Sequence, residues 1–209
     1  MKKKKKKKNR MIIAFGHRRR VGKDVATRAF IDMLAKRGIP AVRVSFADGL
    51  KEVCTDIFGW AGLQGPEYYE EFPQEKEDIL PDLGLSPRTI WVETGSSLRQ
   101  LYEDVWIDMA LNQPKGRKAV IIISDLRYPN EVAKVKAVGG VLVKVTRDTA
   151  PVSEDVADCA LDSFDEWDLI LDNNGTIDYL REQMLSLVNI VETVYGFPTV
   201  KKQQKKGED

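Results

Sequence analysis

The sequence has few of the residues from which metal centres and disulfide frameworks are built. Among its 209 residues are two cysteines, Cys54 and Cys159, and one histidine, His17. The cysteines show neither metal-ligand nor redox spacing, so we expect two small buried side chains in a reducing compartment. The sequence also shows no obvious pairing of a nucleophile with a base.

Long apolar segments are absent as well. No run of eighteen or more apolar residues exists, so the sequence predicts no transmembrane helix. The lysine-rich start lacks the apolar stretch and the cleavage site of a signal peptide. We therefore expect a soluble, cytoplasmic protein with no membrane partner. The formal net charge of +1 argues against a nucleic-acid binder whose whole surface is basic.

The length predicts one domain with a sizeable core and a small inserted subdomain. Both ends are rich in lysine, and we expect residues 1–10 and 196–209 to be disordered tails. Such tails could contact nucleic acid by releasing counterions, although a solvated tail is the simpler interpretation. The folded domain is expected to span residues 11–195.

Strand-like and helix-like stretches alternate between these tails. The most hydrophobic run, Ala119–Ser124, has the composition of a central strand covered on both faces. This alternation predicts an α/β fold in three layers, with a mostly parallel five-stranded sheet and helices on both faces. The expected strands are 11–15, 41–46, 119–124, 141–146 and 169–171, and the expected helices are 25–36, 48–58, 90–112, 130–138 and 176–194.

The stretch Met11–Phe30 combines a strand, a basic loop bounded by glycines and a helix. This is the context of a phosphate-binding P-loop, because the free N–H groups and the dipole of a helix start favour an anion. Gly22 would let the backbone approach a phosphate closely, and Lys23 would reach the terminal phosphates of a nucleoside triphosphate. The alternative is a basic strand-to-helix turn without a ligand.

The spacing departs from the usual G-x-x-x-x-G-K-[ST] pattern. Five residues separate Gly16 from Gly22, whereas the four-residue spacing would put His17 at the first glycine. Asp24 replaces the hydroxyl that normally holds Mg²⁺. A carboxylate is a hard oxygen ligand that could hold magnesium directly or through water, or it could merely support the first helical turn.

A second motif, Ser124–Glu131, leaves the carboxyl end of the most buried strand, and ligands bind at that edge of a parallel sheet. Asp125 stands where a P-loop enzyme keeps its second acidic group for Mg²⁺ or its waters. Arg127 could direct a bidentate guanidinium at a phosphate. An ion pair between Asp125 and Arg127 that braces the turn is the structural alternative.

Asp48 follows the second predicted strand and faces the same edge of the sheet. It could position an acceptor, accept a hydrogen bond from it, or simply cap the following helix. The sequence leaves these roles open.

Residues 59–88 lack a long apolar period and are rich in glycine, proline and acids. A loop of this length inside a compact domain is expected to be a functional lid. Lys76, Arg88 and Arg99 supply separated positive charges within and just after it, as an anionic acceptor would need.

Together these motifs resemble phage-type deoxynucleoside monophosphate kinases of the P-loop superfamily. The resemblance implies a P-loop kinase fold and Mg²⁺-dependent transfer of the ATP γ-phosphoryl group to a deoxynucleoside 5′-monophosphate, giving the diphosphate. It also implies a homodimer, in the host cytoplasm if a phage encodes the protein. The matching segments, in order, are Gly22–Asp24, Phe46–Glu52, Ser86–Arg88, Thr94–Arg99 with Asp104–Trp106, Ser124–Glu131, Gly139–Gly140 and Asp172–Thr176.

The resemblance also assigns site residues. Those implied for ATP binding are Gly16, Arg20, Gly22, Lys23, Asp24 and Val25, and those implied for the metal are Asp24 and Asp125. An acceptor-binding insertion is implied at about residues 62–112, and the acceptor-binding residues are Asp48, Lys51, Arg88 and Arg99. The implied catalytic residues are Lys23, Asp125 and Arg127, with Arg127 contacting phosphate or ordering the site.

One stretch departs from the resemblance, and three alternatives stay open. A His-x-Ser-Glu stretch that many of these kinases carry before the last strand is replaced here by Asp155–Asp158. The first alternative is a P-loop kinase for another small acceptor, of the dephospho-coenzyme A or phosphomevalonate type. The second is a regulatory module that binds the nucleotide without turnover. The third is a nucleic-acid-binding protein that acts through its lysine tails.

Overall fold

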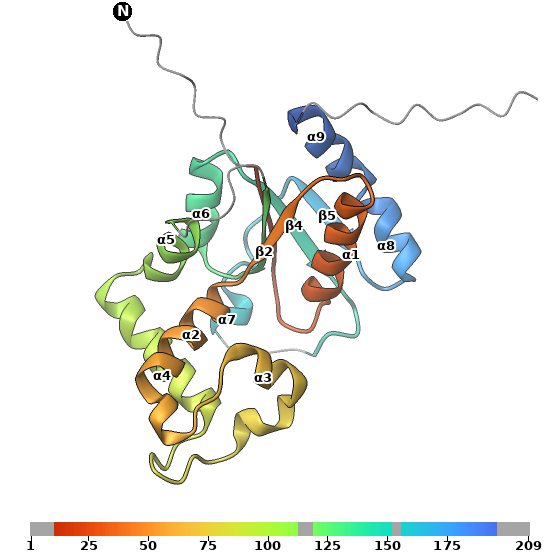
Figure 1. The fold of residues 1–209 in the computed structure, drawn as a ribbon. Coiled ribbons are helices and arrows are strands. Elements are labelled where there is room, and N and C mark those ends of the chain that lie inside the picture. The colour runs from red at the N-terminus through yellow and green to blue at the C-terminus, as the bar shows by residue number, and fades with distance from the viewer. Residues whose placement is uncertain (1–10, 113–118, 152–155, 196–209) are drawn as a thin grey trace, which may run out of the picture.

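The computed structural model describes residues 11–112, 119–151 and 156–195, so the predicted tails lie outside the described residues. Five parallel strands form one sheet in the order β2-β3-β1-β4-β5 (Figure 1). This confirms the predicted α/β fold and is the strand order expected of a P-loop kinase. The strands are β1 Ile12–Gly16, β2 Ala41–Val44, β3 Val120–Leu126, β4 Val141–Thr146 and β5 Leu169–Asp172.

Helices cover both faces of the sheet (Figure 1). Ile13 and Phe15 of β1 point into a core shared with α1, α8 and α9, whereas Ile12 and Ala14 point into a core shared with α5 and α6. Because successive side chains enter opposite apolar layers, the strands read as continuous hydrophobic runs. These helices are α1 Lys23–Ala35, α5 Val105–Asn112, α6 Pro129–Ala137, α8 Ile177–Gln183 and α9 Leu185–Tyr195. No helix within the described ranges is both long enough and apolar enough to cross a membrane.

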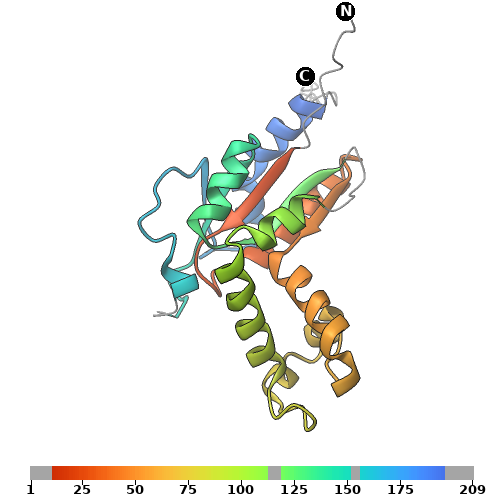
Figure 2. The same cartoon turned by 90° about the vertical axis from the view of Figure 1, so that its left-hand side faces the viewer.

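Residues 46–101 form an arm that projects from the carboxyl edge of the sheet (Figures 1 and 2). The arm has its own small core, in which Cys54, Leu63, Tyr69 and Trp91 are buried. Its elements are α2 Phe46–Phe58, the 3₁₀ helix η1 Gly59–Ala61, α3 Pro66–Glu71, the 3₁₀ helix η2 Pro73–Glu77 and α4 Pro87–Leu101. The prediction of an irregular segment at 59–88 was therefore wrong in part, because helices of one or two turns are too short to show an apolar period.

Two predicted helices are interrupted. The helix expected over 90–112 starts earlier, after the N-cap Ser86, and breaks at Tyr102, whose backbone is extended. The helix expected over 176–194 is divided into α8 and α9 at the buried Met184. Each break changes the direction of the chain, so that both halves bury apolar residues, a packing effect that periodicity alone does not reveal.

Candidate functional site

The loop between β1 and α1 adopts left-handed backbone conformations at three residues. The φ angles are 95° at His17, 60° at Arg20 and 94° at Gly22. Glycine is the usual residue at such angles, so His17 occupies the backbone position that the four-residue spacing assigns to the first glycine. Gly16 belongs to β1, where it pairs with both neighbouring strands. The loop therefore has the usual P-loop length and begins at His17.

Lys23 is a buried cation at the start of α1, with 6% of its surface exposed. Its Nζ donates to the carbonyl oxygens of His17 at 3.0 Å and Arg18 at 2.5 Å, so the ammonium is held by its own loop. Burial, and then the charge of Arg127, lower the pKa of Lys23 to about 8. A buried cation whose hydrogen-bond partners are only carbonyl groups favours an anion nearby. A phosphate would compensate its positive charge, and the attraction is strong because the surroundings have a low dielectric constant.

A cavity of 610 Å³ opens at the carboxyl edge of the sheet, between the P-loop and the arm. Its size is in the range of nucleotide and cofactor sites. Ten of the predicted site residues line it: Arg20, Gly22, Lys23, Asp24, Val25, Asp48, Lys51, Arg99, Asp125 and Arg127. The structure therefore brings together residues from the P-loop, the start of α1, the carboxyl end of β3 and the arm.

Two predicted site residues do not line this cavity. Gly16 lies within β1, where a Cβ would come within 2.8 Å of the Trp167 ring. Arg88, in the first turn of α4, pairs with Glu77 near the tip of the arm. Lys76, the other cation that the sequence noted in this segment, does line the cavity.

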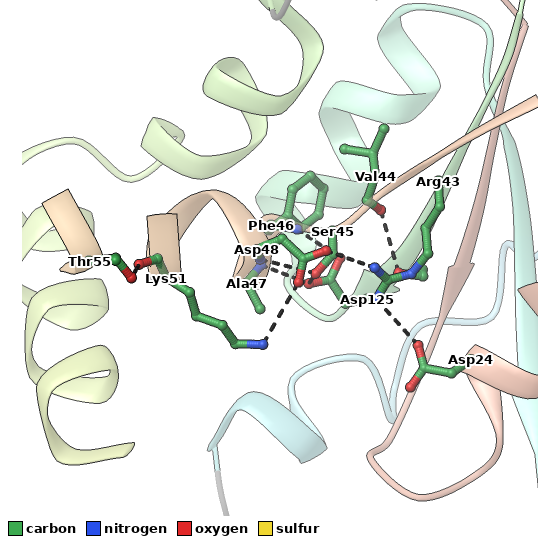
Figure 3. Close-up of polar contacts among 11 residues, drawn as sticks. Asp24, Arg43, Val44, Ser45, Phe46, Ala47, Asp48, Lys51, Thr55 and Asp125 are labelled. Carbon is green, nitrogen blue, oxygen red and sulfur yellow. Dashed lines mark hydrogen bonds and ion pairs between the residues drawn. The ribbon is translucent and has the colours of Figure 1, made fainter. Parts of the chain in front are cut away.

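Asp125 joins the end of β3 to the start of α2 (Figure 3). Its Oδ2 accepts from Ser45 Oγ at 2.8 Å and from the Ala47 N–H at 3.0 Å, and its Oδ1 accepts from the Phe46 N–H at 3.0 Å. These N–H groups belong to the first turn of the helix, which has no intrahelical acceptor for them. Asp125 thus caps α2 from another element and does not pair with Arg127, the alternative that the sequence offered.

Arg43 of β2 links two of the predicted carboxylates on the cavity wall (Figure 3). Its Nη1 lies 2.7 Å from Asp48 Oδ2, and its Nη2 lies 3.7 Å from Asp24 Oδ1. Asp48 also pairs with Lys51 at 3.8 Å. The helix cap is Ser45, whose Oγ accepts the Asp48 N–H, so the Asp48 side chain remains in the cavity wall.

Arg99 of α4 is oriented by two groups at the start of α6. Its guanidinium carbon lies 4.2 Å from the centroid of the Tyr128 ring, and its Nη2 donates to Glu131 Oε1 at 3.0 Å. The other oxygen of Glu131 accepts the N–H groups of Arg127 at 2.8 Å and Tyr128 at 3.0 Å. Burial raises the pKa of Glu131 to about 7, although these N–H donors and Arg99 oppose the shift. Arg99 is therefore held at the cavity by a stacking surface and a buried acid.

Sequence reasoning missed Arg43, Glu131 and Asp158 as parts of the site. Glu131 stood in a quoted motif, three residues after the N-cap Tyr128, which is a capping-box spacing that could have been recognised. Arg43 carries a local signal too, because a charged residue inside a strand of otherwise apolar residues needs a partner. Asp158 had no such signal, because its partners are 139 and 31 positions away.

Comparison with known proteins identifies a relative of this chain. No family model matches the chain. A curated protein of Acanthamoeba polyphaga mimivirus, named "Putative deoxynucleotide monophosphate kinase", is 28% identical over 193 residues, covering 80% of this chain and 91% of the viral protein. The two proteins are homologues. Their relationship confirms the resemblance found in the motifs, and the parallel sheet is consistent with a P-loop kinase fold.

Proposed function

We propose that this protein transfers the γ-phosphoryl group of ATP to a deoxynucleoside 5′-monophosphate, releasing ADP and the diphosphate. The observation that carries the proposal is that one cavity receives the P-loop lysine, Lys23, from the start of α1 and three cations, Lys51, Lys76 and Arg99, from the arm. Two phosphate-bearing substrates have to meet in such a reaction, and each needs its own positive charges. The mimivirus relative, by its name, supports the choice of acceptor.

ATP would bind at the P-loop. Its phosphates would take the place of the two carbonyl oxygens that now accept from Lys23, and the N–H groups of the loop and the α1 start would surround them. Arg20 and Val25, which line the cavity beside Gly22, would flank the phosphate chain.

The acceptor would bind on the arm side of the same cavity. Arg99 is the residue best placed to hold its phosphate, because Tyr128 and Glu131 already orient the guanidinium. Lys51 and Asp48, from the first turns of α2, would contact the rest of the nucleotide.

The transfer itself needs positioning and charge stabilisation more than proton transfer. The acceptor is already a phosphate anion, so no strong general base is required. Arg127 is close enough to Lys23 to lower its pKa, and the two cations together would stabilise the charge on the transferred phosphoryl group. Movement of the arm toward the sheet would exclude water and suppress ATP hydrolysis.

The carboxylates of the cavity wall fit Mg²⁺. Asp24 has an exposed side chain and only a long contact of 3.7 Å with Arg43, so its oxygens are accessible. Asp125 Oδ1 accepts one hydrogen bond and keeps a second lone pair. One or two carboxylates, together with substrate phosphates, are a common set of ligands for Mg²⁺. When bound, Mg²⁺ would neutralise charge on the phosphates.

A coupled assay of ADP release tests the proposal. Purified protein, ATP and Mg²⁺ are offered each deoxynucleoside and ribonucleoside monophosphate in turn, and then dephospho-coenzyme A and phosphomevalonate. We expect turnover with one or more deoxynucleoside monophosphates and a loss of about a hundredfold to a thousandfold in kcat/KM for Lys23→Ala.

Lys36→Ala is the matched control, because Lys36 is an exposed lysine at the far end of the same helix. It should turn over at the rate of the unmodified protein. ATP binding without turnover of any acceptor would instead favour the regulatory module. Turnover of dephospho-coenzyme A or phosphomevalonate alone would show that the protein is a kinase for that acceptor and not for a deoxynucleoside monophosphate.

The homodimer implied by the resemblance is a further part of the proposal. Light scattering on an eluting size-exclusion peak should give about twice the chain mass of 23.6 kDa. A mass of one chain at working concentration would contradict it.

A further inference from the structure

The connection between β4 and β5 supports the P-loop from outside the cavity. Asp162 holds Arg18 through two bonds, from Nε to Oδ1 at 2.8 Å and from Nη2 to Oδ2 at 2.5 Å. Asp158, in the short helix α7 Val156–Cys159, accepts the N–H of the next loop residue, Arg19, at 3.2 Å. Two acids of this connection thus hold consecutive residues of the ATP-binding loop.

Asp158 also reaches the other side of the candidate site. The same Oδ1 that accepts from Arg19 accepts from Arg127 Nη1 at 2.8 Å, and the carboxylate has 0% of its side-chain surface exposed. A carboxylate buried this completely is stable only while its cationic and N–H partners stay in place. One oxygen atom therefore ties the P-loop backbone to a guanidinium that belongs to the turn between β3 and α6.

Arg127 is held by Asp158 on one side only. Its side chain keeps 31% of its surface exposed, and it lines the central cavity together with Lys23. Five N–H donors are available to a guanidinium, so the bond to Asp158 leaves others accessible to a phosphate. Arg127 alone would also repel Lys23, and the nearby negative charge of Asp158 offsets that repulsion.

We propose that Asp158 is a positioning residue for phosphoryl transfer. Its carboxylate fixes Arg127 relative to the Arg19 N–H, so that the P-loop and the guanidinium form one rigid site for the transferred phosphate. The inference rests on the proposed kinase function and deepens it. It also gives a role to residue 158 of the 155–158 stretch, the segment in which this chain departs from the motifs of the kinases it resembles.

Steady-state kinetics of Asp158→Asn tests the inference. The amide keeps the size of the side chain but loses the charge that orients Arg127. We expect kcat to fall about tenfold to a hundredfold, as a misplaced catalytic group does, while KM for ATP and for the monophosphate changes less than about threefold. Glu166→Gln is the matched control. Glu166 lies in the same connection and pairs with Lys136 at the surface, so its loss should leave kcat unchanged.

A double-variant comparison separates positioning from a merely structural role. If Asp158 acts through Arg127, then Arg127→Gln combined with Asp158→Asn should be no slower than Arg127→Gln alone, within about twofold. This double variant removes both charges together and leaves no buried charge unpaired, so it keeps the inference testable even if Asp158→Asn does not fold.

Three results would overturn the inference. They are an unchanged kcat in Asp158→Asn, a further tenfold loss in the double variant, and a gain in ATP affinity in Asp158→Asn, which would show that the carboxylate occupies a phosphate site. An unmodified protein that transfers phosphate to none of the acceptors would count against the proposed function instead, and the two failures are thereby distinguished.

Discussion

Single residues of this site carry charges whose state depends on burial. Burial and the neighbouring Arg127 lower the pKa of Lys23 to about 8, from 10.5 in a solvated lysine. Lys23 is therefore charged at neutral pH and loses its proton at mildly alkaline pH. The loss of this charge weakens the attraction for phosphate.

We expect the affinity for ATP to fall above pH 8. One unit above the pKa only about a tenth of Lys23 keeps its proton, so binding at pH 9 should be about tenfold weaker than at pH 7. Titration calorimetry with a non-hydrolysable ATP analogue measures this. Lys23→Met should bind ATP weakly, with an affinity that does not change between these two pH values. An affinity of the unmodified protein that stays constant up to pH 10 would refute the lowered pKa of Lys23.

The pKa of Glu131 is shifted in the opposite direction, upward. Burial raises its pKa to about 7 in the folded protein, above the 4.5 of a solvated glutamate. The folded protein thus keeps a proton that the unfolded chain releases between these values, and the free energy of unfolding falls as the pH rises through this window. Glu131→Gln has no proton to lose.

Relative to the unmodified protein, Glu131→Gln should gain about 1–3 kcal/mol in the free energy of unfolding between pH 4.5 and pH 7.5. Urea unfolding at several pH values measures the difference. Two pH profiles that run parallel would show that Arg99 and the two backbone N–H groups hold Glu131 ionised throughout.

At the scale of elements, the helix α2 depends on a capping residue that lies in the strand β3. Asp125 accepts two N–H groups of the first turn and the hydroxyl of Ser45, so it places the helix that carries Asp48 and Lys51. The structure therefore gives Asp125 a structural role beside the metal-binding role that the motif indicates.

Asp125→Ala should lower the free energy of unfolding by about 2–4 kcal/mol, because it leaves three donors without their acceptor. Ser45→Ala removes only the hydroxyl, and it should cost about 1 kcal/mol. Denaturant unfolding compares the two variants. Equal costs would mean that water replaces the carboxylate and that Asp125 acts on the metal alone.

At the scale of the whole molecule, the arm and the sheet have cores of unequal size. The two faces of the sheet are covered by large apolar clusters, whereas the arm encloses a small one around Cys54, Tyr69 and Trp91. Elements with few buried contacts open locally at a lower free energy than the rest of a protein. We therefore expect the arm, rather than the sheet, to move when substrates bind.

Hydrogen exchange measures this movement. With a non-hydrolysable ATP analogue and an accepted monophosphate together, exchange should slow more than about tenfold in α3 and η2, whose Glu70 and Lys76 line the cavity. The strands β1 and β3 should exchange slowly with or without ligand. Protection confined to the P-loop would contradict closure of the arm.

The sheet and the P-loop could be predicted because their signals are local. Met11–Phe15 and Ala119–Ser124 are runs whose composition alone indicates buried strands, and Gly22 and Lys23 follow the first run within a few residues. The length of the loop was harder to predict from the sequence. Only the φ of 95° at His17 and the strand pairing of Gly16 decide where the loop begins.

The structure brings most of the residues that the motifs contained to one cavity, whereas residues whose contacts depend on distant segments had no signal in a motif. Arg99 and Arg127 line the cavity, whereas Arg88 pairs with Glu77 within the arm, and the roles of all three residues stay predictions. Arg43 and Asp158 were missed because their importance lies in partners that only folding brings close.

The sequence by itself determined the class of fold, the order of its strands and helices along the chain, and the loop that would bind phosphate. These follow from hydrophobic periodicity and from the few residues that a tight anion-binding turn allows. Only the tertiary structure decided which charges share a cavity and which acids hold them there. Three contacts illustrate this: Asp125 with the start of α2, Glu131 with Arg99, and Asp158 with Arg127. Each joins segments that are far apart in the chain, so it exists only once the core has packed.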